Sequence, residues 1–244
     1  MQQTITIDEK TIPFQSGQTI MEAAKAADVY IPHLCYHPEL KPHGSCRLCT
    51  VLVNGRPTSA CTTPAQAGQT ILNNTKELNE DRKTLTQMLF IEGNHICPGC
   101  PKTGNCQLQA VAYYVGMLSS HFQHFYPYRE LDASHPDYII DFNRCILCEM
   151  CVRASRDLDK KNVFGISGRG INAHLIVNST SGQLKDTDFA VNDKAAFICP
   201  VGAILRKRLR YTTPIGERLY DQQPINITGD AQQIHAGAKK HEFK

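Results

Sequence analysis

Short stretches of alternating apolar and polar residues dominate the first 77 positions. Five of them are predicted to be β-strands: Thr4–Ile7, Lys10–Phe14, Thr50–Val53, Pro57–Ala60 and Thr70–Leu72. Thr19 and Glu22 have the spacing of a capping box, so we expect a short helix that ends at Ala27. Asn54-Gly55 is a strong hairpin signal between the third and fourth strands. This order predicts a small mixed sheet packed on one helix.

The pattern becomes helical between residues 78 and 118. We expect Asn79 to cap a helix that stops near Gly93, and a second helix to begin near Cys106. The positions predicted to face the core are Leu85, Met88 and Leu89 in the first helix and Leu108, Val111, Ala112 and Val115 in the second. This segment therefore predicts a small helical domain.

The rest of the chain is less regular. Residues 119–144 are rich in aromatic side chains and predict a packed connecting loop rather than a ligand site. Within residues 145–215, the pattern between Cys151 and Cys199 predicts a short helix, a Gly-rich turn at 165–170 and strands around Ala173–Asn178. The polar tail 211–244 has no clear periodicity, and we expect it to lie on a partner chain. The fold class predicted is α+β, with domains at 1–77, 78–118 and 119–210 followed by this tail.

Composition excludes several classes of function. The 244 residues are 41% hydrophobic and 20% charged, as in ordinary globular proteins. The net charge of +3 is too small to indicate nucleic acid or an anionic membrane as a partner. No apolar run approaches the ~18–20 residues of a membrane helix, and the N-terminus lacks the features of a secretory signal. We therefore expect a cytoplasmic protein with reduced thiols.

All eleven cysteines fall into three groups with metal-ligand spacing. The first group is Cys35, Cys46, Cys49 and Cys61. The second group is Cys97, Cys100 and Cys106, with His95 just upstream. The third group is Cys145, Cys148, Cys151 and Cys199, the last followed by Pro200. Eleven thiols and one imidazole make three sets of four ligands.

The third group has the most specific spacing. Bacterial ferredoxins repeat C-x2-C-x2-C-x3-C-Pro, and the fourth cysteine of each run ligates the other cluster. Here the first run has Ser155 in its fourth position, and the second run retains only Cys199. The first three positions of the second run are Phe189, Asn192 and Ala195. Both losses delete the same cluster, so the remaining four cysteines predict one 4Fe–4S cluster.

The other two groups are less decisive. The second group, His-x-Cys-x2-Cys-x5-Cys, suits a 4Fe–4S cluster with one histidine ligand and also a structural zinc site. The first group shares its central C-x2-C with plant-type 2Fe–2S ferredoxins but differs in the outer gaps. A Rieske site is not predicted, because Cys35-Tyr36-His37 has no matching C-x2-H. His33, His37 and His43 are therefore interpreted as loop residues rather than ligands.

These residues carry a resemblance to a known family. The chain resembles, over about residues 1–210, the N-terminal iron–sulfur region of the 75-kDa-type subunit of complex I, whose first module also occurs in iron-only hydrogenases. The motifs are Cys35-Tyr36-His37-Pro38, Gly44-Ser45-Cys46-Arg47-Leu48-Cys49, Cys61-Thr62-Thr63-Pro64, Gly93-Asn94-His95, Gly104-Asn105-Cys106-Gln107-Leu108-Gln109, Asn143-Arg144-Cys145-Ile146 and Cys199-Pro200-Val201-Gly202-Ala203-Ile204. One departure is that Ile96 alone separates His95 from Cys97, where complex I subunits usually have three residues.

The resemblance implies the fold and ligands of each part. It implies an N-terminal β-grasp 2Fe–2S ferredoxin domain, a central helical 4Fe–4S domain and a bacterial-ferredoxin-like domain with one 4Fe–4S cluster. A chain of this length is similar to the small (gamma) diaphorase subunit of NAD-reducing nickel–iron hydrogenases. The partners implied are a flavin- and NAD-binding diaphorase subunit and the small and large hydrogenase subunits, with no nucleic acid and no membrane.

The predicted function is electron transfer without a substrate site on this chain. Gly165-x-x-Gly168-x-Gly170 does not match the dinucleotide fingerprint, no P-loop is present, and no thiolate pair is left over for nickel. No residue is predicted to be catalytic. Three alternatives stay open: the equivalent subunit of an NAD-dependent formate dehydrogenase, a complex I-like NADH dehydrogenase, and a structural zinc module.

Overall fold

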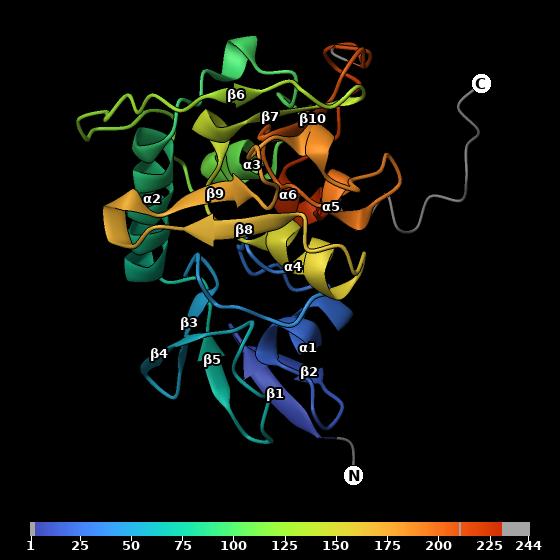
Figure 1. Cartoon of the computed structure of the whole chain (residues 1–244). Coiled ribbons are helices and arrows are strands. Elements are labelled where there is room, and N and C mark those ends of the chain that lie inside the picture. The colour runs from blue at the N-terminus through green and yellow to red at the C-terminus, as the bar shows by residue number, and fades with distance from the viewer. Residues whose placement is uncertain (1–2, 210, 231–244) are drawn as a thin grey trace.

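A five-stranded sheet forms the N-terminal part of the chain (Figure 1, blue to teal). The computed structural model describes residues 3–209 and 211–230. The strands are β1 (Thr4–Ile7), β2 (Lys10–Pro13), β3 (Thr50–Val53), β4 (Arg56–Ser59) and β5 (Thr70–Leu72). Their order is β2-β1-β5-β3-β4; β1 and β5 run parallel, and the other neighbours are antiparallel. The five predicted strands are therefore confirmed, with ends that differ by no more than one residue.

Helix α1 (Ile20–Ala26) packs against this sheet. The capping box is confirmed: the Thr19 hydroxyl accepts from the Glu22 backbone N–H, and the Glu22 carboxylate accepts from the Thr19 N–H at 2.7 Å. Ile20 and Met21 are fully buried on the side of the helix that meets the sheet. The two faces enclose one apolar core.

Two helices follow, α2 (Lys76–Glu92) and α3 (Gln107–Tyr114). The prediction that Asn79 caps the first helix is wrong, because Thr75 accepts from the Leu78 N–H and the helix already begins at Lys76. The predicted end at Gly93 and the start of α3 after Cys106 are confirmed. The predicted apolar face of α2 is only partly right, since Met88 is 44% exposed.

The buried face of α2 is largely polar. Arg82 is 2% exposed and donates to the carbonyl oxygens of Leu48 and Thr50 and to both oxygens of Asn73. Thr86 is also fully buried and donates to the Arg82 carbonyl. The arginine thus joins α2 to the start of β3 and the end of β5 through hydrogen bonds rather than through apolar contact.

The aromatic segment after α3 does not form the packed loop that its composition predicted. The side chains of Phe122, Phe125, Tyr126 and Tyr128 are between 44% and 92% exposed. The backbone is nevertheless held to the body of the protein: Phe125 N–H donates to Ile91 O, and Asn94 Nδ2 donates to Pro127 O. Backbone hydrogen bonds fix the segment while its rings point outward.

The C-terminal part contains two small sheets. The three-stranded sheet has the order β10-β7-β6, with β6 at Leu131–Asp132, β7 at Tyr138–Asp141 and β10 at Ile204–Arg206. The hairpin is β8 (Phe164–Ser167) and β9 (His174–Val177). The strand predicted around Ala173–Asn178 is confirmed, but the Gly-rich turn predicted at 165–170 is wrong at its start, because residues 165–167 belong to β8 and pair with β9. Helices α4 (Met150–Asp157) and α5 (Lys194–Phe197) pack with them around Phe164 and Ile140.

Residues 211–230 pack on the chain itself. Tyr220 N–H donates to Gly104 O, Leu219 N–H donates to Asn105 Oδ1, and helix α6 (Ile225–Thr228) buries Ile225 completely. We call this segment the C-terminal strap. Positions 231–244 of the predicted partner-contacting tail lie outside the described residues, and its contact with a partner stays a prediction.

The helices in the described ranges are short or polar. None in residues 3–209 and 211–230 combines the length and apolar character that crossing a membrane requires.

Candidate metal centres

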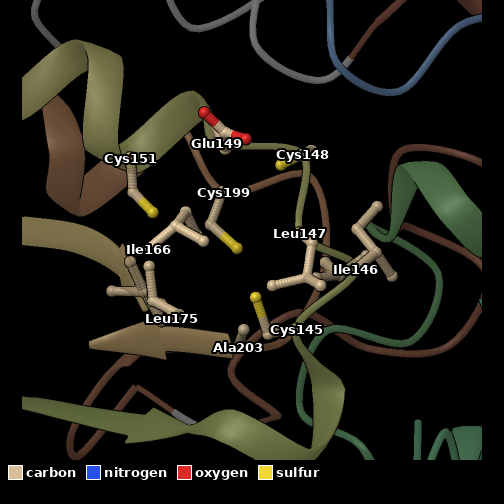
Figure 2. A pocket seen from close by; sticks show the side chains of 12 residues that line it. Cys145, Ile146, Leu147, Cys148, Glu149, Cys151, Ile166, Leu175, Cys199 and Ala203 are labelled. Carbon is tan, nitrogen blue, oxygen red and sulfur yellow. The ribbon is translucent and has the colours of Figure 1, made fainter. Parts of the chain in front are cut away.

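The four cysteines of the third group line one cavity, and Figure 2 shows their sulfur atoms directed toward a common space. Cys145 follows a 3-10 helix at Phe142–Arg144, Cys151 lies in the first turn of α4, and Cys199 follows α5. Two residues of the intervening loop, Leu147 and Glu149, have left-handed backbones with φ of 51° and 57°. The loop therefore winds tightly around the space that the sulfurs share.

Burial makes this cavity unfavourable for bare thiolates. Burial raises the pKa of the Cys145 thiol to about 11 and the pKa values of Cys148 and Cys151 well above their usual range. Ile166 and Leu175 form part of its apolar wall. A bound cation would stabilise the thiolate forms, so the donor set suits a positively charged metal centre that displaces the thiol protons.

The second group also surrounds one cavity. His95, Cys97, Cys100 and Cys106 all line it, although only one residue separates His95 from Cys97. The Nε2 atom of His95 is buried and has no hydrogen-bond partner among the described residues. Burial, helped by the positive charge of Arg144, lowers the pKa of His95 to about 4. A neutral imidazole with an unpaired nitrogen beside three thiols is suited to bind a metal.

Gly93 allows His95 to reach this position. A Cβ atom on Gly93 would lie 2.5 Å from His95 Nε2 and 2.8 Å from the Asn143 carbonyl oxygen. The backbone of Gly93 is extended, so glycine is needed here for space rather than for a left-handed conformation. The glycine in the Gly93-Asn94-His95 motif therefore has a direct steric reason.

The first group forms two close pairs of cysteines. The Sγ atoms of Cys49 and Cys61 are 3.4 Å apart, and Cys46 N–H donates to Cys35 Sγ at 3.5 Å. The hydrogen bond with the Cys46 thiol lowers the pKa of Cys35 to about 5, and that with Cys61 lowers the pKa of Cys49 to about 7. The same two bonds raise the pKa values of Cys46 and Cys61. One thiol in each pair is therefore ready to lose its proton.

The three histidines near the first group have other partners. His33 is buried with its Nε2 atom 3.0 Å from the Asp230 carboxylate and its Nδ1 atom 2.7 Å from Ile31 O. His37 Nδ1 accepts from the Glu39 N–H, and His43 lies 3.4 Å from Glu149. These contacts agree with the interpretation that none of the three is a ligand.

Two arginines to which the sequence assigned no role connect the groups. Buried Arg153 donates from one nitrogen to the carbonyl oxygens of Cys35, in the first group, and Cys148, in the third. Arg144, next to Cys145, donates to Cys100 Sγ in the second group at 3.4 Å. Arg144 and Cys100 are 44 positions apart in the sequence, and Arg153 and Cys35 are 118 positions apart, so no local pattern reveals these contacts.

The described residues do not offer a compact site for a single ion. Over residues 3–209 and 211–230, no three His, Cys, Asp or Glu side chains come close enough together to hold one metal ion. In the second and third groups, four side chains instead surround a shared cavity.

Three protein families match successive parts of the chain. Residues 2–76 match a 2Fe-2S iron-sulfur cluster binding domain, residues 82–121 match the NADH-ubiquinone oxidoreductase-G iron-sulfur binding region, and residues 139–205 match a 4Fe-4S single cluster domain. Together with the cysteine cavities, these matches define an iron–sulfur electron-transfer protein that binds 2Fe–2S and 4Fe–4S clusters.

A more specific relationship follows from similarity over the whole chain. The gamma subunit of the NAD-reducing hydrogenase HoxS of Cupriavidus necator is 40% identical over 91% of this chain and 94% of its own length. A chain in a crystal structure of NAD+-reducing [NiFe]-hydrogenase in the H2-reduced state is 53% identical, with a TM-score of 0.91 over 95% of this chain and 98% of its own. The protein belongs to the family of iron–sulfur gamma subunits of NAD-reducing [NiFe]-hydrogenases.

Longer relatives share only a part of their length with this chain. The mitochondrial 78 kDa subunit of NADH-ubiquinone oxidoreductase from Candida albicans is 30% identical, and the match covers 83% of this chain but 28% of that protein. The alpha subunit of NADPH-Fe(3+) oxidoreductase from Geobacter sulfurreducens is 30% identical, with 24% of its length covered. The predicted resemblance to complex I is thereby confirmed for the iron–sulfur region.

Proposed function

We propose that this chain relays electrons between a flavin- and NAD-binding diaphorase subunit and the small and large subunits of a nickel–iron hydrogenase. It does so as a non-catalytic part of an enzyme that converts H2 and NAD+ to NADH and H+. The similarity to the gamma subunit of HoxS over nearly the full length of both chains supports this assignment.

We assign the first group to the 2Fe–2S cluster and the second and third groups to one 4Fe–4S cluster each. One observation carries the assignment: all four residues of the second group line one cavity, and all four residues of the third group line another. In the second cavity the buried Nε2 atom of His95 has no hydrogen-bond partner among the described residues. The pairing of Cys35 with Cys46 and of Cys49 with Cys61 suits two irons with two thiolates each. Bound at these positions, the clusters supply one-electron redox chemistry.

The proposed domains are a β-grasp ferredoxin at 1–77, a helical domain at 78–118 and a ferredoxin-like domain at 119–210. The parallel β1–β5 pair at the centre of the first sheet and the residue ranges of the three matching families support this division. The protein's own part in the relay is to exclude water from the ligands and hold the three groups in contact. Arg153 and Arg144 contribute those contacts.

Metal and sulfide analysis tests the cluster assignment. One 2Fe–2S and two 4Fe–4S clusters require ~10 iron and ~10 acid-labile sulfide per chain. Cys199→Ser is expected to remove or weaken one 4Fe–4S EPR signal and leave the 2Fe–2S signal unchanged, while Ser16→Ala, at an exposed position, serves as control. Stoichiometric zinc with little sulfide would instead identify the structural zinc module.

Purification of the complex tests the proposed partners. We expect nickel in the purified complex and hydrogen-dependent reduction of NAD+. The similarity to the longer oxidoreductase subunits favours a second candidate, an equivalent subunit of an NAD-dependent formate dehydrogenase or a complex I-like dehydrogenase. Molybdenum or tungsten in place of nickel would indicate the formate enzyme.

A further inference from the structure

Arg144 extends from the third cysteine group into the cavity of the second. Its backbone precedes Cys145, but its guanidinium lines the cavity that His95, Cys97, Cys100 and Cys106 surround. Nη1 donates to Cys100 Sγ at 3.4 Å and to the Gly202 carbonyl oxygen at 3.5 Å. Within residues 3–209 and 211–230, Arg144 is the charged side chain that hydrogen-bonds a cysteine sulfur.

Neighbouring residues hold the guanidinium in this position. The Asp141 carboxylate accepts from Arg144 Nε at 2.9 Å, and both side chains are largely buried, at 21% and 13% exposure. The other Asp141 oxygen accepts from the Asn143 N–H, which fixes the carboxylate in the turn. The pair is therefore an oriented ion pair rather than a mobile surface contact.

The backbone at Gly202 also lies close to the second group. A Cβ atom on Gly202 would lie 2.8 Å from Cys100 Sγ and 3.5 Å from Arg144 Nη1. Gly202 therefore leaves the room in which Arg144 and Cys100 meet. Three separate parts of the chain, 100, 141–144 and 202, build this contact.

We propose that Arg144 sets the reduction potential of the second, histidine-ligated cluster, and that Asp141 limits its effect. The inference rests on the proposed 4Fe–4S site. Reduction adds one electron to the cluster, so a nearby positive charge and an N–H···S hydrogen bond stabilise the reduced form more than the oxidised form. Arg144 therefore raises the potential, and the carboxylate of Asp141, being negative, lowers it.

The effect is directed mainly at one of the three clusters. Although Arg144 adjoins Cys145, no hydrogen bond joins its guanidinium to a third-group sulfur in the described ranges. A single charge a few ångströms away in a partly buried site changes such an equilibrium by about tenfold, after partial neutralisation by a counter-ion. For a one-electron centre, tenfold corresponds to about 59 mV.

Two substitutions with opposite expected signs test the proposal. In the purified complex, each cluster is titrated with dithionite at controlled potential and followed by low-temperature EPR. Arg144→Gln is expected to lower the midpoint potential of the second cluster by about 59 mV, which corresponds to a tenfold change in the one-electron equilibrium. Asp141→Asn keeps an oxygen acceptor for Asn143 N–H and is expected to raise the same potential. The other two clusters should shift much less.

Arg156→Gln is the matched control, because Arg156 is an exposed arginine on α4 whose ion pair is with Asp157. It is expected to leave all three potentials unchanged. Iron and sulfide are measured in every variant, so a failure of the 4Fe–4S assignment is distinguished from a failure of this inference. If Arg144→Gln prevents assembly of the second cluster, the direction in which Asp141→Asn shifts the potential of that cluster decides whether the proposal holds. An unchanged or lowered potential in Asp141→Asn, or an unchanged potential in an assembled Arg144→Gln protein, overturns the proposal.

Discussion

At the scale of single residues, His95 shows how burial prepares a proposed ligand. Its Nε2 atom is enclosed without a hydrogen-bond partner in the described part of the chain, and its ring packs 5.3 Å from that of Phe90. An unpaired buried nitrogen destabilises the protein unless something binds it. A neutral imidazole in place of a thiolate also makes the bound cluster less negative, which favours a higher potential.

Substitution of His95 tests its role as a ligand. We expect His95→Ala to lose up to about four iron atoms per chain, because the second 4Fe–4S cluster is left with three protein ligands. The 2Fe–2S EPR signal should persist. His174→Ala is the control, since His174 is exposed at the start of β9 and its ring hydrogen-bonds a nearby backbone carbonyl, that of Asn172. Full iron content in His95→Ala would show that the imidazole does not ligate.

At the scale of elements, helix α2 is fixed by a buried charge. Five hydrogen bonds join the Arg82 guanidinium to Leu48 O, Thr50 O, Asn73 O, Asn73 Oδ1 and Asn79 Oδ1. Leu48 and Thr50 flank Cys49, so the same side chain holds the helix and the turn that carries Cys49 of the first group. Because the buried Arg82 occupies part of the face of α2 that packs on the protein, the prediction of an apolar face at Leu85, Met88 and Leu89 was only partly right.

Removal of this arginine should weaken both the helix contact and the first cluster. Arg82→Ala leaves several buried carbonyl groups unpaired, with an expected cost of about 3 kcal/mol or more. The measurable results are a lower thermal midpoint and faster chelator-induced bleaching of the 2Fe–2S signal. Lys76→Ala, at an 89% exposed side chain of the same helix, should change neither. Equal bleaching rates in the two variants would contradict this role of Arg82.

At the scale of the whole molecule, the C-terminal strap joins distant parts of the chain. Asp230 is 4% exposed and accepts from Lys25 Nζ at 2.6 Å and from Gln107 Nε2 at 3.1 Å, besides its contact with His33. Burial alone raises the pKa of this carboxyl, but the charges and hydrogen bonds of His33 and Lys25 hold it well below its usual range. One carboxylate thus connects Lys25 in α1 and the buried His33 to the start of α3.

Asp230→Asn tests this connection with little change in shape. The variant leaves Lys25 and His33 without their buried counter-ion, and breaking such a cluster typically costs about 3–5 kcal/mol. We expect a clearly lower thermal midpoint at neutral pH, with iron content initially unchanged. Asp188→Asn, at an exposed carboxylate, provides the control. An unaltered midpoint in Asp230→Asn would mean that the contacts of the strap with α1 and α3 do not stabilise the protein.

Local sequence information accounts for much of the fold. The five strands, the capping box and the start of α3 depend on alternation, turn residues and caps within a few positions, and all were predictable. The cap of α2 was misplaced because Thr75 and Asn79 are both suitable capping residues. The exposed aromatic residues of 119–144 were misjudged because composition does not reveal which way the rings point.

The sequence by itself determined the candidate ligands: eleven cysteines and one histidine, spaced in three sets of four, favour iron–sulfur ligation because thiols two residues apart suit a shared metal better than a disulfide. Only the tertiary structure decided what surrounds each set. Arg144 meets Cys100, Arg153 meets Cys35, and Asp230 meets His33 across 44, 118 and 197 positions. Such pairs have no periodic pattern, since they depend on how separate elements pack. The charges that surround the ligands therefore become visible only in the folded chain.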